Sequence, residues 1–485
     1  MTTNLDAVNG HLSTDKWPAV LLASSPTVIV LLFAFFYGFS YRISGNFLFS
    51  YFLIASAAFF GICLIVVLSI LRSRREKPHL RPDILNRMGA FAVWAVLSTT
   101  VYFYNGDAYI PDKIAIPLVT IVFLGLLWRT GAKSSIFFLT ATGTALFCYA
   151  TLDTNLDVKA ANMLPIIQAG CADLAEGSNP FLALYPDIAT APLYYLPGTV
   201  IPYCPMVWLG QDIRWLNVLI FLVMLGILLS YQRFFRNPGV AALTTLPLLF
   251  SSMSFQMGYY GHVWMYWLAI VLLGLAWLKG RNHLVFLLLG IALLTRQMGL
   301  FLIGMFSVIL FARSGLARSV LHFILAIGIF LAGMMPILLF TEVALTDFFY
   351  GGIKTASNET HGDTINPMDQ VSLAGPFVHA GLRDHLLLIQ AGVACVIFGL
   401  FMFSKNLDRG KLLVLTGVSY IFIIAFSAFL HRYFYVPGLL LMLLGISDLF
   451  AGRYGSSAPP NTAQGAITCS KDRASISKST ASYDS

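Results

Sequence analysis

Charged residues are scarce in this sequence, and their scarcity excludes an ordinary soluble protein. The chain of 485 residues is 58% hydrophobic but only 11% charged, whereas soluble domains carry about 25% charged residues. A mean hydropathy of +0.78 leaves too few polar side chains to cover an apolar core. The composition therefore predicts a polytopic membrane protein, and the clustering of its net charge of +8 between apolar runs argues against a nucleic-acid partner.

Cysteine is also rare, and its spacing does not indicate a metal centre. The six cysteines are scattered along the chain at positions 63, 148, 171, 204, 395 and 469. Close pairs of the kind that bind zinc are missing. Cys171 and Cys204 share one long polar stretch, where a disulfide bond is one of the alternatives. The first apolar run also lacks the basic leader and cleavage pattern of a signal peptide.

Long hydrophobic runs predict an all-α polytopic fold with about 14 transmembrane helices. The runs cover residues 18–39, 46–71, 88–104, 113–128, 134–151, 215–232, 238–255, 261–278, 283–295, 297–312, 319–340, 386–403, 411–430 and 434–450. We expect residues 1–16 and 451–485 to be disordered, because both ends are polar. The spans fall into an N-terminal group, 17–133, and a domain covering 134–450. No internal repeat is evident, which counts against an inverted-repeat transporter.

The distribution of basic residues predicts the orientation of these spans. If the N-terminus is cytoplasmic, 22 of the 30 lysines and arginines fall on the cytoplasmic side, as the positive-inside rule requires. Both termini are then cytoplasmic, and the two long loops, 152–214 and 341–385, are extracytoplasmic. The polar span ends that contain Arg296 and Arg432 face the same side, so we expect the functional site there.

The first long loop holds the most distinctive residues. Asp153 and Asp157 are four residues apart where the chain leaves the membrane, so both would share one helical face. Apolar residues at 156, 160, 163, 164 and 167 have the spacing of a short helix. A turn at 177–181 and a tyrosine- and proline-rich stretch follow. Asp212 and Arg214 close the loop, where a structural pair is the favoured interpretation.

The order of these motifs resembles the first external loop of GT-C glycosyltransferases, in particular the bacterial polyprenyl-phosphate-sugar-dependent, mannosyltransferase-like group. The resemblance covers roughly residues 134–450. It rests on an acid at the start of an external helix, a G-x-N-P-F turn and a Tyr/Pro segment, followed by basic span ends. The matching pieces are Asp157-Val-Lys-Ala-Ala-Asn, Gly177-Ser-Asn-Pro-Phe181, Leu193-Tyr-Tyr-Leu-Pro197, Asp212-Ile-Arg-Trp-Leu-Asn217, Thr295-Arg-Gln297 and His431-Arg-Tyr433.

This resemblance implies transfer of a sugar, with inversion, from a polyprenyl-phosphate donor to an acceptor hydroxyl on a glycan or lipid. The enzyme would lie in the bacterial inner (plasma) membrane. It would need no cofactor, although a divalent cation is left open. Asp157 or Asp153 would be the catalytic base. The other implied site residues are Arg296, Arg432 and His431 for the donor phosphate, and Tyr194, Tyr195 and Gln297 for the substrate.

The same residues are also compatible with structural roles and with other functions. Asp157 could serve a helix dipole, the arginines could extend their charged ends to the membrane interface, and the tyrosines could form an interfacial belt. A ligase or polymerase of the O-antigen type would depend more on the 341–385 loop, which we otherwise expect to be a lid over the acceptor. A non-enzymatic lipid or sugar transporter would need broken helices and charges near the membrane midplane.

Overall fold

The computed structural model is a bundle of helices joined mostly by short connections. It describes residues 17–40, 47–72, 82–104, 110–153, 163–181, 185, 188, 193, 195–340, 371–427 and 432–451. Every regular element in these ranges is an α-helix or a 3-10 helix, and they contain no strand. The two polar termini, Asp157, Tyr194, His431 and residues 341–370 of the expected lid lie outside the described residues.

Five helices form the first part of the bundle: α2 (Trp17–Ser40), α3 (Phe47–Arg72), α4 (Pro82–Tyr104), α5 (Ile110–Arg129) and α6 (Ala132–Asp153). Their bounds follow the apolar runs, apart from α4, which begins before its run. Pro82 takes the first helical position, where a missing N–H costs nothing, and Asp83 places a negative charge in the first turn. Both features favour an early start for α4.

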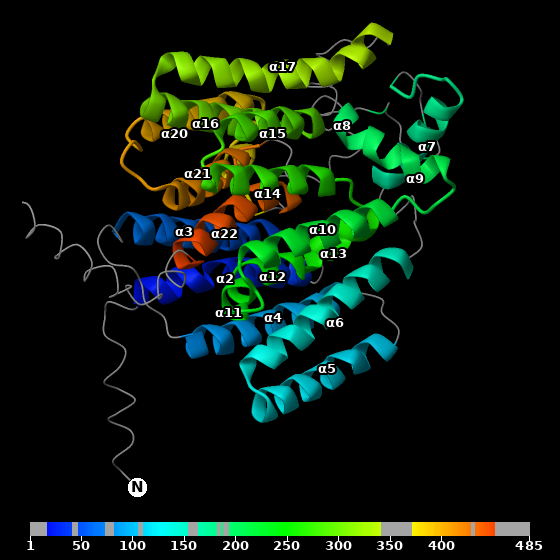
Figure 1. Cartoon of the computed structure of the whole chain (residues 1–485), viewed down its shortest axis with the longest axis vertical. Helices are drawn as coiled ribbons and strands as arrows, with labels where there is room; N and C mark the ends of the chain where they lie inside the picture. Colours follow the sequence, from blue (N-terminus) through cyan, green and yellow to red (C-terminus); the bar gives the residue numbers. More distant parts are fainter. Residues whose placement is uncertain are drawn as a thin grey trace, which may run out of the picture.

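The second part of the bundle begins after the first long loop. Its long helices are α10 (Trp215–Tyr231), α14 (Trp264–Leu278), α15 (Asn282–Thr295), α16 (Gly299–Ser314), α17 (Leu316–Phe340), α20 (Leu386–Phe401), α21 (Arg409–Ile424) and α22 (Val436–Ala451). Shorter elements are α19 (Gly375–His379), η4 (Arg383–His385) and η5 (Arg432–Tyr435). The long helices lie side by side, so that the chain connections gather at the two ends of the bundle (Figure 1).

The apolar run 238–255, expected as one span, is divided into α11 (Pro238–Leu243), α12 (Thr245–Leu249) and α13 (Ser252–Tyr260). Ser251 is extended and its hydroxyl caps α13 by accepting from the Ser254 N–H. Carbonyl groups freed at the breaks need partners inside a membrane protein. Thr27 of α2 donates to the Leu243 carbonyl at 2.9 Å and Thr100 of α4 to the Phe250 carbonyl at 2.8 Å. Neighbouring helices therefore stabilise the interruption.

Six described helices are long and apolar enough to cross a membrane: Ser50–Ile70, Pro82–Tyr102, Ala132–Asp153, Leu316–Leu339, Arg383–Phe401 and Arg432–Phe450. Other apolar helices, including α10, α14, α15 and α16, are shorter than 18 residues. The chain is thus an α-helical protein with the composition of a membrane protein.

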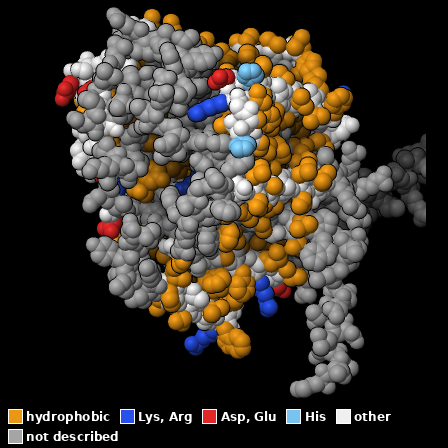
Figure 2. Space-filling model, turned by 180° about the vertical axis from the view of Figure 1, so that it is seen from behind, with side chains coloured by type: hydrophobic (Ala, Val, Ile, Leu, Met, Phe, Trp, Pro, Cys, Tyr) orange, Lys and Arg blue, Asp and Glu red, His pale blue; other side chains and the backbone are white. Residues whose placement is uncertain are grey.

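Burial separates the centre of the bundle from its periphery. In the most apolar window of α22, 89% of the residues are buried, against 22% in those of α17 and α20. α22 packs closely on α21, because a Cβ on Gly417 would overlap the Gly438 carbonyl oxygen. Small residues permit this approach in membrane bundles. Hydrophobic side chains cover much of the described surface of the back face, with only small groups of charges (Figure 2).

Candidate functional site

The first long loop forms a compact cap of short helices at one end of the bundle. It contains α7 (Met163–Ala175), α8 (Pro197–Val200), η2 (Ile201–Tyr203) and α9 (Cys204–Trp208). α7, α8 and α9 lie together beyond the ends of the long helices, at the right in Figure 1. The helical spacing seen around residues 156–167 corresponds in part to α7, which extends further along the chain than expected. Residues 154–162 lie outside the described part.

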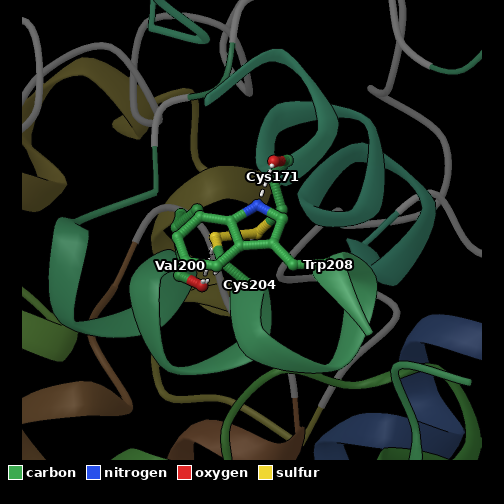
Figure 3. The surroundings of a disulfide bond; sticks show 4 residues. All are labelled: Cys171, Val200, Cys204 and Trp208. Atoms are coloured by element: carbon green, nitrogen blue, oxygen red, sulfur yellow. Dashed lines mark hydrogen bonds between the residues drawn. A yellow bond between two sulfur atoms is a disulfide. The ribbon is translucent and has the colours of Figure 1, made fainter. Parts of the chain in front are cut away.

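A disulfide bond between Cys171 and Cys204 joins α7 to α9. The indole ring of Trp208 lies against it, and its N–H donates to the Cys171 carbonyl oxygen at 2.9 Å (Figure 3). The Val200 carbonyl oxygen is 3.7 Å from the Cys204 sulfur. The disulfide that the sequence left as one alternative is therefore formed, and it closes the part of the loop that carries Tyr195.

An ion pair fixes the other edge of the loop. Arg214 is 5% exposed, and its Nε donates to both carboxylate oxygens of Asp212 at 2.9 and 3.0 Å. Its Nη2 also donates to the Leu152 carbonyl oxygen in the last turn of α6, at 3.3 Å. Partial burial alone would raise the pKa of Asp212, but the hydrogen bonds and charge of Arg214 outweigh it and hold that pKa below its usual value. The pair is structural, as the sequence favoured.

The turn at 177–181 is also structural. Asn179 Oδ1 accepts a hydrogen bond from the Phe181 N–H at 3.0 Å, an Asx turn that needs no ligand. Tyr185 then donates from its hydroxyl to Asp173 of α7 at 2.6 Å. Burial raises the pKa of Tyr185, and the Asp173 carboxylate raises it further. The turn therefore orders the loop around α7.

Close packing of α8 onto the end of α15 brings two predicted site residues together. Thr199 donates from its hydroxyl to the Thr295 carbonyl oxygen at 2.6 Å. A Cβ on Gly198 would lie 2.9 Å from the Leu294 carbonyl oxygen, so only glycine permits this approach. The contact positions Tyr195, just before α8, beside Arg296, just after α15.

Arg296 is the centre of the candidate site. Its Nη2 lies 2.7 Å from Nε2 of His262, and because a guanidinium only donates, Nε2 accepts. Its guanidinium carbon lies 5.7 Å from the ring centre of Tyr433 and 5.8 Å from that of Phe434, within the range of cation–π attraction. The ring of Tyr195 lies 4.1 Å from that of His262. The side chains come from four separate connections at the same end of the bundle.

The electrostatics of this site are those of one cation among neutral rings. Within the described part of the chain, no carboxylate forms an ion pair with Arg296, in contrast to Arg214. Burial raises the pKa of Tyr195, and the charge of Arg296 lowers that pKa only in part. The phenol of Tyr195 therefore stays protonated, and the site keeps a positive charge.

No protein-family model, curated protein or solved structure matches this chain. The chemistry of the site is therefore inferred from its own residues.

A small cavity of about 10 Å³ lies next to Arg296, close to the space that one water molecule needs. Its wall includes Tyr266 of α14 and Tyr420 of α21, whose hydroxyl oxygens lie 3.2 Å apart. The remaining lining residues are Val263, Trp267, Met298, Tyr433, Phe434 and Pro437. The cavity has room for about one water molecule or one polar group of a ligand beside Arg296.

The structure places the expected site residues as follows. Arg296 and Tyr195 are brought together, and Arg432 is the first residue of η5, next in the chain to Tyr433. Gln297 is partly exposed one residue beyond Arg296, and Asp153 is exposed at the end of α6. Asp157, Tyr194 and His431 lie outside the described residues. No group of three or more His, Cys, Asp or Glu side chains in the described part could hold a metal ion.

Sequence reasoning gave no role to His262, Phe434, Tyr266 and Tyr420. His262 ends the polar stretch QMGYYGH at a predicted span end, a signal that could have identified it. The tyrosines are inside apolar runs, where nothing in the pattern distinguishes a cavity wall from ordinary core. Their proximity to Arg296 depends on how α14, α21 and η5 pack.

Proposed function

We propose that this protein is an integral membrane glycosyltransferase of the GT-C type, which transfers a sugar from a polyprenyl-phosphate donor to an acceptor hydroxyl. The observation that carries the proposal is Arg296, a half-buried cation held by His262 and aromatic rings and given no described carboxylate as counter-ion. A charge that is partly removed from water is costly unless an opposite charge or hydrogen-bond partners compensate it. The phosphate of a lipid donor would supply that opposite charge.

The topology proposed with this function has fourteen spans, with both termini cytoplasmic and the site extracytoplasmic. The six long helices and the shorter apolar helices supply the spans, with α11, α12 and α13 together as one of them. The disulfide between Cys171 and Cys204 supports an extracytoplasmic cap, because disulfide bonds persist in oxidising compartments. This arrangement puts α7–α9 and Arg296 on the same outer side of the bacterial inner membrane.

In the proposed reaction the acceptor oxygen attacks the anomeric carbon of the donor sugar, and the bond from that carbon to the phosphate oxygen breaks. Asp157 or Asp153 takes the proton of the acceptor hydroxyl. Polyprenyl phosphate leaves with the bonding electrons. Arg296, together with Arg432 and His431, stabilises the negative charge on the leaving phosphate. Tyr195, with Tyr194 and Gln297, contacts the sugar.

The test separates donor binding from chemistry in the full-length purified protein. Binding of undecaprenyl phosphate and transfer from a panel of undecaprenyl-phosphate hexoses are measured for Arg296→Ala, Asp157→Asn and Asp153→Asn. Loss of Arg296 should weaken undecaprenyl-phosphate binding at least about tenfold. Replacement of the base should leave binding intact and lower transfer by about 10²–10⁴-fold. Arg236→Ala, an exposed arginine in the α10–α11 connection, is the matched control.

The results for these variants can contradict the proposed roles of Arg296 and of the two aspartates. Unchanged lipid binding in Arg296→Ala, or an equal loss in the Arg236→Ala control, would contradict the phosphate role. Full transfer activity in both aspartate variants would remove the proposed base. Loss of activity only after substitution in residues 341–385 would favour a ligase or polymerase of lipid-linked glycans.

A transporter is the second candidate, because the interruption between α11 and α13 is a feature that transporters use. The polar groups around its first break are neutral: Gln232 donates to the hydroxyls of Thr245 and Ser447, both at 2.6 Å. These neutral side chains hydrogen-bond to one another across helices. Movement of a lipid-linked sugar across vesicles by wild type and Asp157→Asn alike, without any transfer product, would favour this candidate.

A further inference from the structure

A second basic site lies at the end of the bundle opposite Arg296. It is a cleft of about 660 Å³ between the α14–α15 connection and the first turns of α17, lined by Gly280, Arg281, Asn282, His283, Leu284, Arg318 and His322. α15 connects the two sites, with the cleft at its first residues and Arg296 directly after its last. At 14 residues, this helix separates them by about 21 Å.

The cleft collects positive charge without a negative residue in its lining. The first turns of α15 and α17 both contain no acidic residue, so the positive ends of two helix dipoles remain available. Arg281 and Arg318 add guanidinium groups from two different elements. Peptide N–H groups at helix starts and arginine side chains are the donors that phosphate oxygens prefer.

His322 gives the cleft a buried polar group that the fold leaves unused. It is 5% exposed, and its Nδ1 lies 2.7 Å from the Arg318 carbonyl oxygen, so Nδ1 carries the proton. Its Nε2 is buried and has no hydrogen-bond partner among the described residues, although such groups are normally paired. The ring is held by His283, stacked at 4.5 Å, and by Phe286 at 5.2 Å. A ligand in the cleft would supply the missing partner.

The surroundings of the cleft distinguish a lipid from a soluble ligand. Leu284 in its wall is 38% exposed, and the outer side of α17 continues with Leu316, Val320, Leu321 and Ile324, exposed by 44–65%. A molecule with a phosphate in the cleft could place acyl chains along this apolar side. Arg409 donates to the Asn282 side chain at 3.3 Å and to the Trp277 carbonyl at 2.7 Å, which fixes the rim of the cleft.

We propose that this cleft binds the phosphate group of an anionic phospholipid, with the acyl chains lying along α17. Arg281 and Arg318 contact the phosphate oxygens, and Nε2 of His322 accepts a hydrogen bond from a hydroxyl of the headgroup. The ligand occupies the leaflet opposite the Arg296 site. The cleft shares no residue with that site, so the proposal does not depend on the glycosyltransferase function.

The test measures lipid retained by the purified full-length protein in native mass spectrometry. Phosphatidylglycerol is compared with phosphatidylcholine of the same chain length. We expect one equivalent of phosphatidylglycerol on the wild type and at least about tenfold weaker binding in Arg281→Ala/Arg318→Ala. Both arginines are exposed, so the fold should persist. Arg236→Ala/Lys405→Ala removes two exposed charges from other connections and should bind the lipid as the wild type does.

A second variant isolates the buried histidine. His322→Phe keeps an aromatic ring between His283 and Phe286 but removes Nε2, together with the Nδ1 bond to the Arg318 carbonyl. It should weaken phosphatidylglycerol binding about three- to tenfold. Equal retention of the two lipids, or equal losses in the cleft variant and the control, would overturn the proposal. Retention of inorganic phosphate by the wild type without phosphatidylglycerol would replace the lipid with a soluble anion and overturn it as well.

Discussion

Two arginines of the described structure show how one residue type serves two purposes. Arg214 is almost fully buried, and its charge is neutralised by Asp212. Arg296 is half-buried and bonds to a neutral histidine and aromatic faces. Both flank predicted spans, and in the sequence the nearby Asp212 already favours a structural pair for Arg214. The partners of Arg296 become known only from the packed structure.

The Asp212–Arg214 pair leads to a prediction about stability. Asp212→Asn leaves the buried guanidinium without its counter-charge and should lower the free energy of unfolding by about 2 kcal/mol at pH 7. Because the pKa of Asp212 is lowered in the folded protein, its contribution is present above pH about 4 and is lost as the pH falls through the folded value. The difference between variant and wild type should therefore shrink at pH 3. Thermal unfolding in detergent measures this difference in stability between the variant and the wild type.

Asp408→Asn is the matched control for this prediction. Asp408 is exposed, lies 3.8 Å from the Lys411 ammonium group and caps α21 by accepting from the Lys411 N–H. Asparagine preserves the cap and removes only an exposed charge, so its effect should stay below about 0.5 kcal/mol. Equal effects of the two substitutions would contradict the assigned role of the buried pair.

At the scale of the elements, the long helices could be predicted and the interruptions could not. Apolar length alone predicts α2, α3, α10 and α22 to within a few residues, because a span needs a fixed number of apolar residues. The breaks between α11 and α13 depend on hydroxyl groups of Thr27 and Thr100, which are far away in the sequence. A local pattern contains no information about such partners.

The cap formed by α7, α8 and α9 supports a prediction about its disulfide. The double variant Cys171→Ser/Cys204→Ser removes the bond that joins two residues 33 positions apart in the sequence. It should lower the stability of the cap by about 3–4 kcal/mol. Because Tyr195, which we propose contacts the sugar, lies inside the closed segment, transfer from an undecaprenyl-phosphate hexose should fall as well. Hydrogen exchange of α7 and α9 measures the stability, and Cys63→Ser, remote in the chain, is the control. Unchanged exchange in the double variant would show that packing around Trp208 alone holds the cap.

At the scale of the molecule, the bundle has two chemically different ends. One end carries the disulfide, the cap and Arg296, and the other carries the basic connections and the cleft at Arg281 and Arg318. The distribution of basic residues along the sequence is enough to predict such a difference between the ends. The convergence of His262, Tyr195, Arg296 and Tyr433 could not be predicted, since four connections must pack at once to form it.

The chemical difference between the two ends of the bundle predicts a membrane topology that reporter insertions can measure. Alkaline phosphatase inserted at Gly210, in an exposed turn after α9, should be active if the cap faces the oxidising side, as we propose. Green fluorescent protein inserted at Gly315, between α16 and α17, should be fluorescent if that basic connection is cytoplasmic, as the proposed topology requires. Both glycines have positive φ, 65° and 87°, and lie between helices, where an insertion disturbs little packing. If alkaline phosphatase were active at Gly315 and inactive at Gly210, the membrane orientation would be reversed, and Arg296 would face the cytoplasm without access to an extracytoplasmic acceptor.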